Sequence, residues 1–338
     1  MIDSLSIVTF ISNKEKFSEE LFTLYRKLLP AFKFVEFIVF SDTEVLSLQQ
    51  IDGKNVRQVI SAGSTKYKRI ISSLEISRAE NILYIDNDIS PNVEQLLLFL
   101  RNLENNTDLA FGRIAINNPQ TFVEKLIFLD KILSHSFIRP LLWSMGLGIS
   151  IPGQIFMIKK NNFFRDLNFS IDTVFDDLFL GICAKQNNYH VTRSQLILGY
   201  EKPSKNFSVL LRQRIRWARG YYESLVCNIK AKVFPLIIVH GIAYHFVSVI
   251  LIIALLLQSR HSVEFALGIY LLICLLLADF KWSMVPYAIS YFIVFTIIHF
   301  IWFISLMKNF VFSLKRVKRL FHPTLGFAEW KIRWRGKK

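Results

Sequence analysis

Two pairs of aspartates are the residues of this sequence best suited to chemistry. Asp86 and Asp88 stand two residues apart, directly after the apolar run 82–85. Two carboxylates in that position can hold a hard divalent cation, because Mg²⁺ and Mn²⁺ are bound by one or two carboxylates together with substrate phosphates. The same spacing is also typical of an Asx turn or a helix cap, so this pair by itself does not decide between the two.

The second pair, Asp176 and Asp177, lies among apolar residues in the stretch FDDLFLG. A carboxyl group whose pKa is raised by burial can serve as a general base toward a hydroxyl group. The structural alternative is the acidic first turn of a helix, which the helix dipole stabilises.

A third group lies in the stretch QRIRW. Gln213, Arg216 and Trp217 are spaced i, i+3 and i+4, so on a helix they share one face. A guanidinium forks onto phosphate oxygens, and an indole offers a flat face to a sugar ring. The alternative is a tryptophan at a membrane surface with arginines beside it.

The segments that would position these residues alternate between strand and helix. Apolar runs at 6–11, 34–40, 56–60 and 82–85 predict strands, and the spacing at 16–29 and 66–79 predicts helices. This alternation indicates an α/β fold with a parallel sheet covered on both faces, which binds ligands at the carboxyl ends of its strands. Further along, we expect a strand at 155–158 and helices at 176–186 and 207–230, while the rest of 89–200 is less regular.

The second half of the chain predicts a membrane region. The runs 233–257 and 282–307 contain no Asp, Glu, Lys or Arg, and each is long enough to cross a bilayer. The shorter run 265–278 is expected to be re-entrant or interfacial, or else a tilted third span. The net charge is +15, and basic residues gather beside the long runs, which is typical of the cytoplasmic side of a membrane. We therefore expect membrane lipids, and no nucleic acid, as partners.

The order of these motifs resembles that of family-2 glycosyltransferases with membrane-embedded C-termini, such as cellulose, chitin and hyaluronan synthases and the ceramide glucosyltransferases. The matching residues are Asp42, Asp86-Asn87-Asp88, Asp176-Asp177 with the following LFLG, and 213–217, and the resemblance extends from about residue 6 to residue 221. It implies a cytoplasmic GT-A type domain at 1–205 with a parallel sheet that binds a nucleotide-sugar. An amphipathic interfacial helix would follow at 206–232, a membrane region at 233–307, and a basic tail at 308–338.

The resemblance also implies a role for each residue. Asp177 would be the catalytic base, although the pair here is Asp-Asp where the family has Glu-Asp. The donor would be bound by Thr9, Asp42, Lys68, Asp86 and Asp88, with Lys66 and Arg69 as further basic residues near the phosphates. The metal would be held by Asp88 and Asp86. The diphosphate and the acceptor would contact Gln213, Arg216, Trp217, Gly153, Gln154 and Asp176.

These implications define an expected activity. The chain would move a sugar, with inversion, from a nucleotide-sugar to a lipid or lipid-linked acceptor, using Mg²⁺ or Mn²⁺. The expected donor is a UDP-sugar. The protein would be a multi-pass protein of the inner membrane, with its catalytic domain in the cytoplasm because no basic-then-apolar leader begins the sequence. Two alternatives stay open: a short processive polysaccharide synthase that extends a glycan acceptor and needs an export partner or self-association, and a catalytically inactive membrane scaffold.

Overall fold

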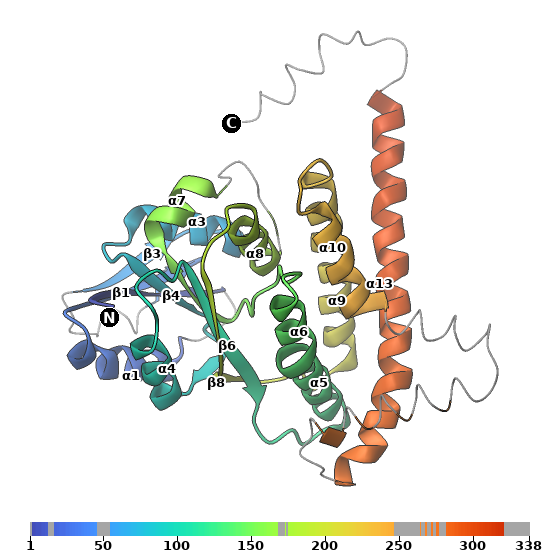
Figure 1. Ribbon diagram of the computed structural model, residues 1–338, viewed down its shortest axis with the longest axis horizontal. Helices are drawn as coiled ribbons and strands as arrows, with labels where there is room; N and C mark the ends of the chain where they lie inside the picture. Colours follow the sequence, from blue (N-terminus) through green and yellow to red (C-terminus); the bar gives the residue numbers. More distant parts are fainter. Residues whose placement is uncertain are drawn as a thin grey trace.

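One mixed sheet forms the centre of the N-terminal two thirds of the chain (Figure 1). The computed structural model describes residues 2–12, 17–45, 55–167, 173, 175–246 and 282–320, together with five isolated positions between 264 and 276. Within these residues the strand order is β3-β2-β1-β4-β7-β6-β8-β5. The strands are β1 (Ser4–Ile11), β2 (Phe34–Ser41), β3 (Val56–Ile60), β4 (Asn81–Ile85), β5 (Ile89–Pro91), β6 (Leu109–Ile116), β7 (Ile155–Lys159) and β8 (Val191–Glu201).

The predicted parallel pairing is confirmed for the first four strands, but the sheet as a whole is mixed. Strands β3, β2, β1 and β4 run parallel, as their apolar, continuous sequences predict. Strand β7 is antiparallel to both of its neighbours, β4 and β6, and β5 is antiparallel to β8. The direction in which a strand enters a sheet depends on the connections before it, and those connections fall in the region 89–200, where the sequence pattern is irregular.

Helices cover both faces of the sheet, as predicted. The helices of the sheet region are α1 (Glu19–Leu28), the 3-10 turn η1 (Leu29–Ala31), α3 (Lys66–Ile76), α4 (Val93–Arg101), α7 (Lys160–Asp166) and α8 (Asp176–Gln186). Alternate residues of β1 point to opposite sides, because the side-chain period of a strand is two. Ile7 packs with α1 and α4 in one core, and Val8 packs with α3, α7 and α8 in the other.

A second layer of helices lies on the far side of β6 and β8, at the right of Figure 1. It consists of α5 (Phe122–Ile132), the π-helix η2 (Leu133–Ile138), α6 (Arg139–Ser144), α9 (Phe207–Cys227), α10 (Phe234–Gly241), the π-helix η3 (Ile242–Phe246), the 3-10 turn η4 (Trp282–Met284) and α13 (Val285–Leu320). Helix α13 packs along α9 and α5. Their shared cores include Phe295 beside α5 and Trp302 beside α9.

Among the described residues, one helical stretch is long and apolar enough to cross a membrane. It is Val285–Val311, with a mean hydropathy of 2.1 and 41% of its most apolar window buried within the protein. The apolar helical stretch Phe234–His245 is shorter than a bilayer-crossing helix. The remainder of the predicted span 233–257 and most of the uncertain segment 265–278 lie outside the described residues.

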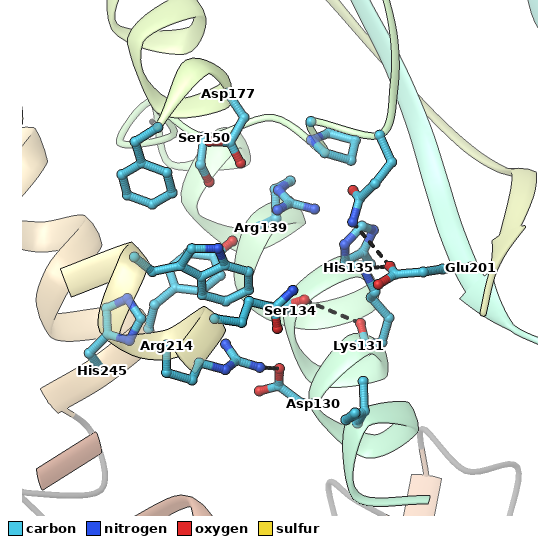
Figure 2. A pocket seen from close by; sticks show the side chains of 18 of the residues that line it. Asp130, Lys131, Ser134, His135, Arg139, Ser150, Asp177, Glu201, Arg214 and His245 are labelled. Carbon is cyan, nitrogen blue, oxygen red and sulfur yellow. Dashed lines mark hydrogen bonds and ion pairs between the residues drawn. The ribbon is translucent and has the colours of Figure 1, made fainter. Parts of the chain in front are cut away.

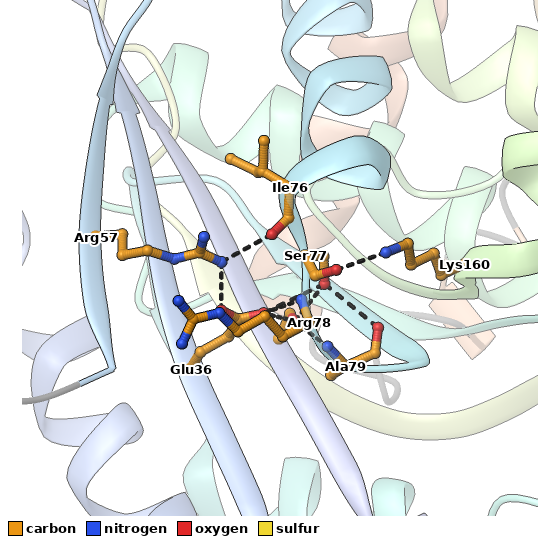
Figure 3. A network of polar contacts seen from close by, with 8 residues as sticks. Glu36, Arg57, Ile76, Ser77, Arg78, Ala79 and Lys160 are labelled. Carbon is orange, nitrogen blue, oxygen red and sulfur yellow. Dashed lines mark hydrogen bonds and ion pairs between the residues drawn. The ribbon is translucent and has the colours of Figure 1, made fainter.

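A buried carboxylate near the amino-terminal ends of β1 and β2 links these strands to β3 and to the turn after α3 (Figure 3). Glu36 on β2 is 1% exposed. It accepts hydrogen bonds from the Ser6 hydroxyl at 2.5 Å and from the Arg78 backbone N–H at 2.6 Å, and it pairs with Arg57. Arg57 also donates to the Ile76 carbonyl at 2.9 Å. Because this carboxylate of β2 bonds groups on β1, on β3 and on the turn that follows α3, it fixes where α3 ends relative to these three strands.

Candidate active site

An outer groove opens at the carboxyl ends of β4 and β8 and is closed on one side by α9. Asp86 and the exposed Asp88 come directly after β4, and Glu201 is the last residue of β8. The groove is also lined by Gly153 and Gln154 before β7, by Asp176 and Asp177 at the start of α8, and by Gln213, Arg216 and Trp217 of α9. The structure therefore brings together, in one groove, all three groups of residues singled out by their types and spacing.

Lys66, the first residue of α3, is the cation that joins the two aspartate pairs. Its ammonium lies 2.6 Å from an Asp86 oxygen and 3.6 Å from an Asp176 oxygen, and it donates to the Gly153 carbonyl at 2.7 Å. Burial lowers the pKa of Lys66, but the nearby carboxylates of Asp176 and Asp86 more than offset this and leave it raised. Burial raises the pKa of Asp86 to about 7, against the lowering effect of Lys66.

Asp177 stands at the junction of the outer groove and a second cavity, the inner pocket, because it lines both. Burial, together with the charge of Asp176, raises the pKa of Asp177 to about 7. One of its oxygens accepts the N–H of Leu178 at 2.9 Å, which holds the carboxyl group at the first turn of α8. A carboxyl group with this pKa can take up a proton near neutral pH.

Two glycines allow this close approach to Asp177. A Cβ atom on Gly153 would lie 3.1 Å from the Asp177 Cβ, so only glycine leaves the aspartate its present place without a shift. A Cβ on Gly181 would lie 1.9 Å from the Ile149 carbonyl oxygen. The glycine four residues after Asp177 is therefore needed for α8 to pack against the irregular segment that precedes Gly153.

Helix α9 presents two faces to this region. Gln213, Arg216 and Trp217 face the outer groove, as their i, i+3, i+4 spacing predicts. Arg214 turns to the other side, where it is buried, lies 2.5 Å from an Asp130 oxygen on α5 and covers the Trp217 ring at 4.2 Å. Asp130 also accepts the Tyr291 hydroxyl of α13 at 2.9 Å. Arg214 thus holds both the tryptophan and the helix in place.

The inner pocket lies on the helical side of Asp177, between α5, η2, α9 and α10 (Figure 2). On one wall Glu201 accepts the Gln154 amide at 3.0 Å and pairs with Lys131. On the opposite wall are Arg214 with Asp130, and the Trp217 ring. The pocket is therefore lined by paired charges and aromatic rings, with Asp177 at the side toward the groove.

Three residues predicted to bind the donor lie away from this groove. Thr9 is fully buried within β1, so its side chain has no exposed surface for a ligand. Lys68 is exposed on α3 and does not line the groove, whereas Lys66, two residues earlier, does. Asp42, at the end of β2, lies 2.5 Å from Arg69 and accepts the Gly63 N–H at 3.3 Å. The groove therefore includes neither the Thr9 side chain nor Lys68, and their roles in donor binding stay predictions.

The residues that sequence reasoning missed come mainly from the irregular region and from β8. They are Glu201, Lys131, Asp130, Arg139 and Arg214. The sequence did contain one sign of where a helix of this region begins. Thr121 and Glu124 form a capping box at the start of α5, with the Glu124 N–H donating to the Thr121 hydroxyl oxygen at 3.2 Å.

The carboxylate oxygens of the groove fit a divalent cation that a bound diphosphate would also ligate. No group of three or more His, Cys, Asp or Glu side chains that could hold a metal occurs in the part of the chain that the structure describes. Mg²⁺ and Mn²⁺ need only one or two carboxylates when phosphates supply further oxygens. Asp88 meets that need, because it is exposed and lines the groove. Asp86 is already paired with Lys66.

Comparison with known proteins defines the class of this fold and then its family. A mannosyltransferase from Pyrobaculum calidifontis, solved in complex with GDP-Man and Mn²⁺, superposes with a TM-score of 0.54 at 13% identity, covering 90% of this chain and 87% of that one. The fold is that of the GT-A glycosyltransferases. Residues 81–315 match the sequence model of glycosyl transferase family group 2. The chain belongs to this family.

A curated relative agrees with this assignment. The probable glycosyltransferase YdaM of Bacillus subtilis (strain 168) is 25% identical over 178 residues, which cover 52% of this chain. The chain spans 42% of the length of that relative.

Proposed function

We propose that this enzyme is an inverting, divalent-metal-dependent glycosyltransferase that moves a sugar from a nucleotide-sugar, with UDP as the expected nucleotide, to a lipid or lipid-linked acceptor at the cytoplasmic face of a membrane. The observation that carries the proposal is the position of Asp177. It is a carboxyl group with a pKa near neutrality that lines both the groove containing Asp88 and Arg216 and the inner pocket. A donor in the groove and an acceptor in the pocket would meet at this residue.

In the proposed reaction, the nucleotide-sugar lies in the outer groove with its diphosphate between Asp88 and Arg216. The Asp177 carboxylate accepts the proton of an acceptor hydroxyl, and that oxygen attacks the anomeric carbon from the side opposite the diphosphate. A divalent cation at Asp88, when bound, would neutralise charge that develops on the departing diphosphate. Arg216 donates to the same oxygens, and Trp217 offers its ring to the sugar or the acceptor.

The membrane part of the proposal is supported by the outer face of α13. Seven apolar residues on it, each at least 40% exposed, recur every three or four positions: Ile289, Ile293, Ile297, Phe300, Ile304, Met307 and Val311. At about 1.5 Å per residue this stripe is about 33 Å long, close to the hydrocarbon thickness of about 30 Å. The opposite face is buried against α9 and α5. A continuous exposed apolar stripe of this length fits lipid chains, and we propose that α13 is inserted in the bilayer.

Membrane insertion has a direct measurement. Cell membranes that contain the full-length chain would be washed with alkaline carbonate, which strips proteins held only by charge. We expect the chain to stay in the pellet, because the α13 stripe would hold it by apolar burial. Recovery in the wash would contradict insertion and leave only surface attachment.

The catalytic proposal is tested by release of nucleoside diphosphate from UDP- and GDP-sugars by the detergent-purified chain. We expect release from one donor with Mg²⁺ or Mn²⁺, its loss on adding a chelator, and a fall of at least about 100-fold in Asp88→Asn, because the metal would lose its protein ligand. Asp3→Asn is the matched control, since Asp3 is exposed and its pairing with Lys33 lies on the surface. Release that is unaffected by both chelator and Asp88→Asn would contradict metal dependence. The length of the product then separates transfer of one sugar to a glycolipid from synthesis of a polysaccharide.

A further inference from the structure

A cluster of three arginines that form no ion pair with a described carboxylate lies next to the inner pocket. Arg113 of β6, Arg139 of α6 and Arg193 of β8 line one small cavity, the arginine chamber, together with His135, Ser194 and Gln195. No described Asp or Glu lines this chamber. Its neighbour, the inner pocket, contains two further cations, Lys131 and Arg214, but both are paired with carboxylates. Among the described residues of the two cavities, the arginines of the chamber are therefore the cations that form no ion pair with a carboxylate, and Asp177 is an acidic group whose charge acts on Arg139.

Several donors of this cluster are buried without an acceptor. The Nε and Nη1 atoms of Arg139 and the Nε atom of Arg113 are inaccessible and have no hydrogen-bond partner among the residues that the structure describes. Leaving a buried charged donor without a hydrogen bond is unfavourable, so such groups call for a ligand or a functional reason. Arg193 is partly occupied, because it donates to the Pro140 carbonyl at 3.0 Å.

The chamber and the inner pocket are adjacent, because Arg139 and His135 line both cavities. In Figure 2 the Arg139 guanidinium points into the inner pocket on the side toward Asp177, and no hydrogen bond or ion pair is drawn to it. The π-helix η2 lies immediately before Arg139. Single π-turns inside α-helices are frequent at functional sites, and here the turn directs His135 and Arg139 toward one cavity.

The electrostatics of the neighbouring groups agree with a positive chamber. Burial, with the charges of Arg139, Lys131 and Arg113, holds the pKa of His135 well below its ordinary value, so its imidazole is neutral. Its Nδ1 atom accepts the Ile114 N–H at 3.3 Å, which leaves the other ring nitrogen as the N–H donor. His135 therefore adds a donor to the chamber and no negative charge.

From this geometry we propose that the acceptor of this enzyme carries a phosphate group, which is bound by Arg139 and Arg113 while the reacting hydroxyl lies at Asp177. The guanidinium fork matches the spacing of phosphate oxygens and gives short, charge-assisted hydrogen bonds. Converging arginines fit the charge of a phosphate monoester or diester better than that of a single carboxylate. This proposal rests on the proposed function, since it assigns the substrate class of the same site.

The test is equilibrium binding to the detergent-purified full-length chain by titration calorimetry. The probes are dioctanoyl phosphatidic acid, sn-glycerol 3-phosphate and, as the uncharged comparison, dioctanoylglycerol. We expect at least one phosphate probe to bind more tightly than dioctanoylglycerol, without displacement by UDP or GDP. Arg139→Gln should weaken that binding at least about 10-fold, the effect of losing a hydrogen bond to a charged group. Arg101→Gln, at an exposed arginine at the end of α4, should leave it unchanged.

Arg113→Gln provides a second variant, with the same expected direction, if Arg139→Gln does not fold. Thermal stability gives an independent measure, because removing an unpaired buried cation should leave the melting temperature unchanged or raise it, whereas losing a structural residue would lower it. Binding of phosphatidic acid alone would indicate a lipid acceptor, and binding of glycerol phosphate alone a soluble one.

The proposal is overturned if neither phosphate probe binds, if dioctanoylglycerol binds equally well, or if Arg139→Gln and Arg113→Gln both bind the phosphate probe like the unaltered chain. Release of nucleoside diphosphate is measured without any acceptor. Its presence would keep the transferase proposal intact even where the phosphate proposal fails, so the two failures are distinguishable.

Discussion

Replacing Asp177 by Asn is expected to lower the rate of sugar transfer by about 10³-fold, the usual contribution of a general base. Asn fills the same space and can still accept the Leu178 N–H, so donor binding and the fold should be retained. The measurement is single-turnover transfer alongside the dissociation constant of the nucleotide-sugar. Asp3→Asn again serves as the control for the loss of an acidic side chain. Transfer within a few-fold of the unaltered enzyme would remove Asp177 from the role of base.

The pH dependence of the unaltered enzyme gives the same assignment a second test. As the proposed base, Asp177 would act only when it is ionised, and burial raises its pKa to about 7. We therefore expect kcat/KM to fall as the pH drops below about 7 and to level off above it. The charges that bear on this pKa are Asp176, which raises it, and Arg139 and Lys66, which lower it. Asp177→Asn should abolish this acidic limb, and a profile that is flat between pH 5 and 8 would contradict the assignment.

Replacing Glu36 by Ala is expected to lower the free energy of unfolding by about 3 kcal/mol, which corresponds to a fall of about 6–12 °C in melting temperature. The change would leave the Arg78 N–H and the Arg57 guanidinium without their buried carboxylate partner. Thermal unfolding of the purified chain measures it. Glu36 is near the amino-terminal end of β2, whereas the groove is at the carboxyl ends of the strands. Nucleotide release by the protein that remains folded should therefore be unchanged.

Glu75→Ala is the matched control for that variant. Glu75 is exposed on α3, so its loss should shift the melting temperature by about 1 °C or less. Equal shifts for Glu36→Ala and Glu75→Ala would mean that the buried network contributes nothing to stability.

Much of the first half of the fold could be predicted from local patterns. β3 begins and ends where the apolar run 56–60 predicts, and α8 has the expected bounds Asp176–Gln186. These elements are predictable because a buried strand must be continuously apolar and because acidic residues favour the first turn of a helix. The direction of β7 was not predictable, since a five-residue apolar strand reads the same in either orientation.

The sequence by itself determined the class of chemistry. The types and spacing of Asp86 and Asp88, of Asp176 and Asp177, and of Gln213, Arg216 and Trp217 are local, and local geometry places each group at a strand end, a helix start or one helix face. Only the tertiary structure decided which other residues join them. Lys66 meets Asp86 and Asp176, and Arg139 meets Arg113, because packing of the sheet against helices unites residues that are distant in the chain. Charges pair in a folded interior only where the distance between them in space is short. The spacing of residues along the chain does not give that distance.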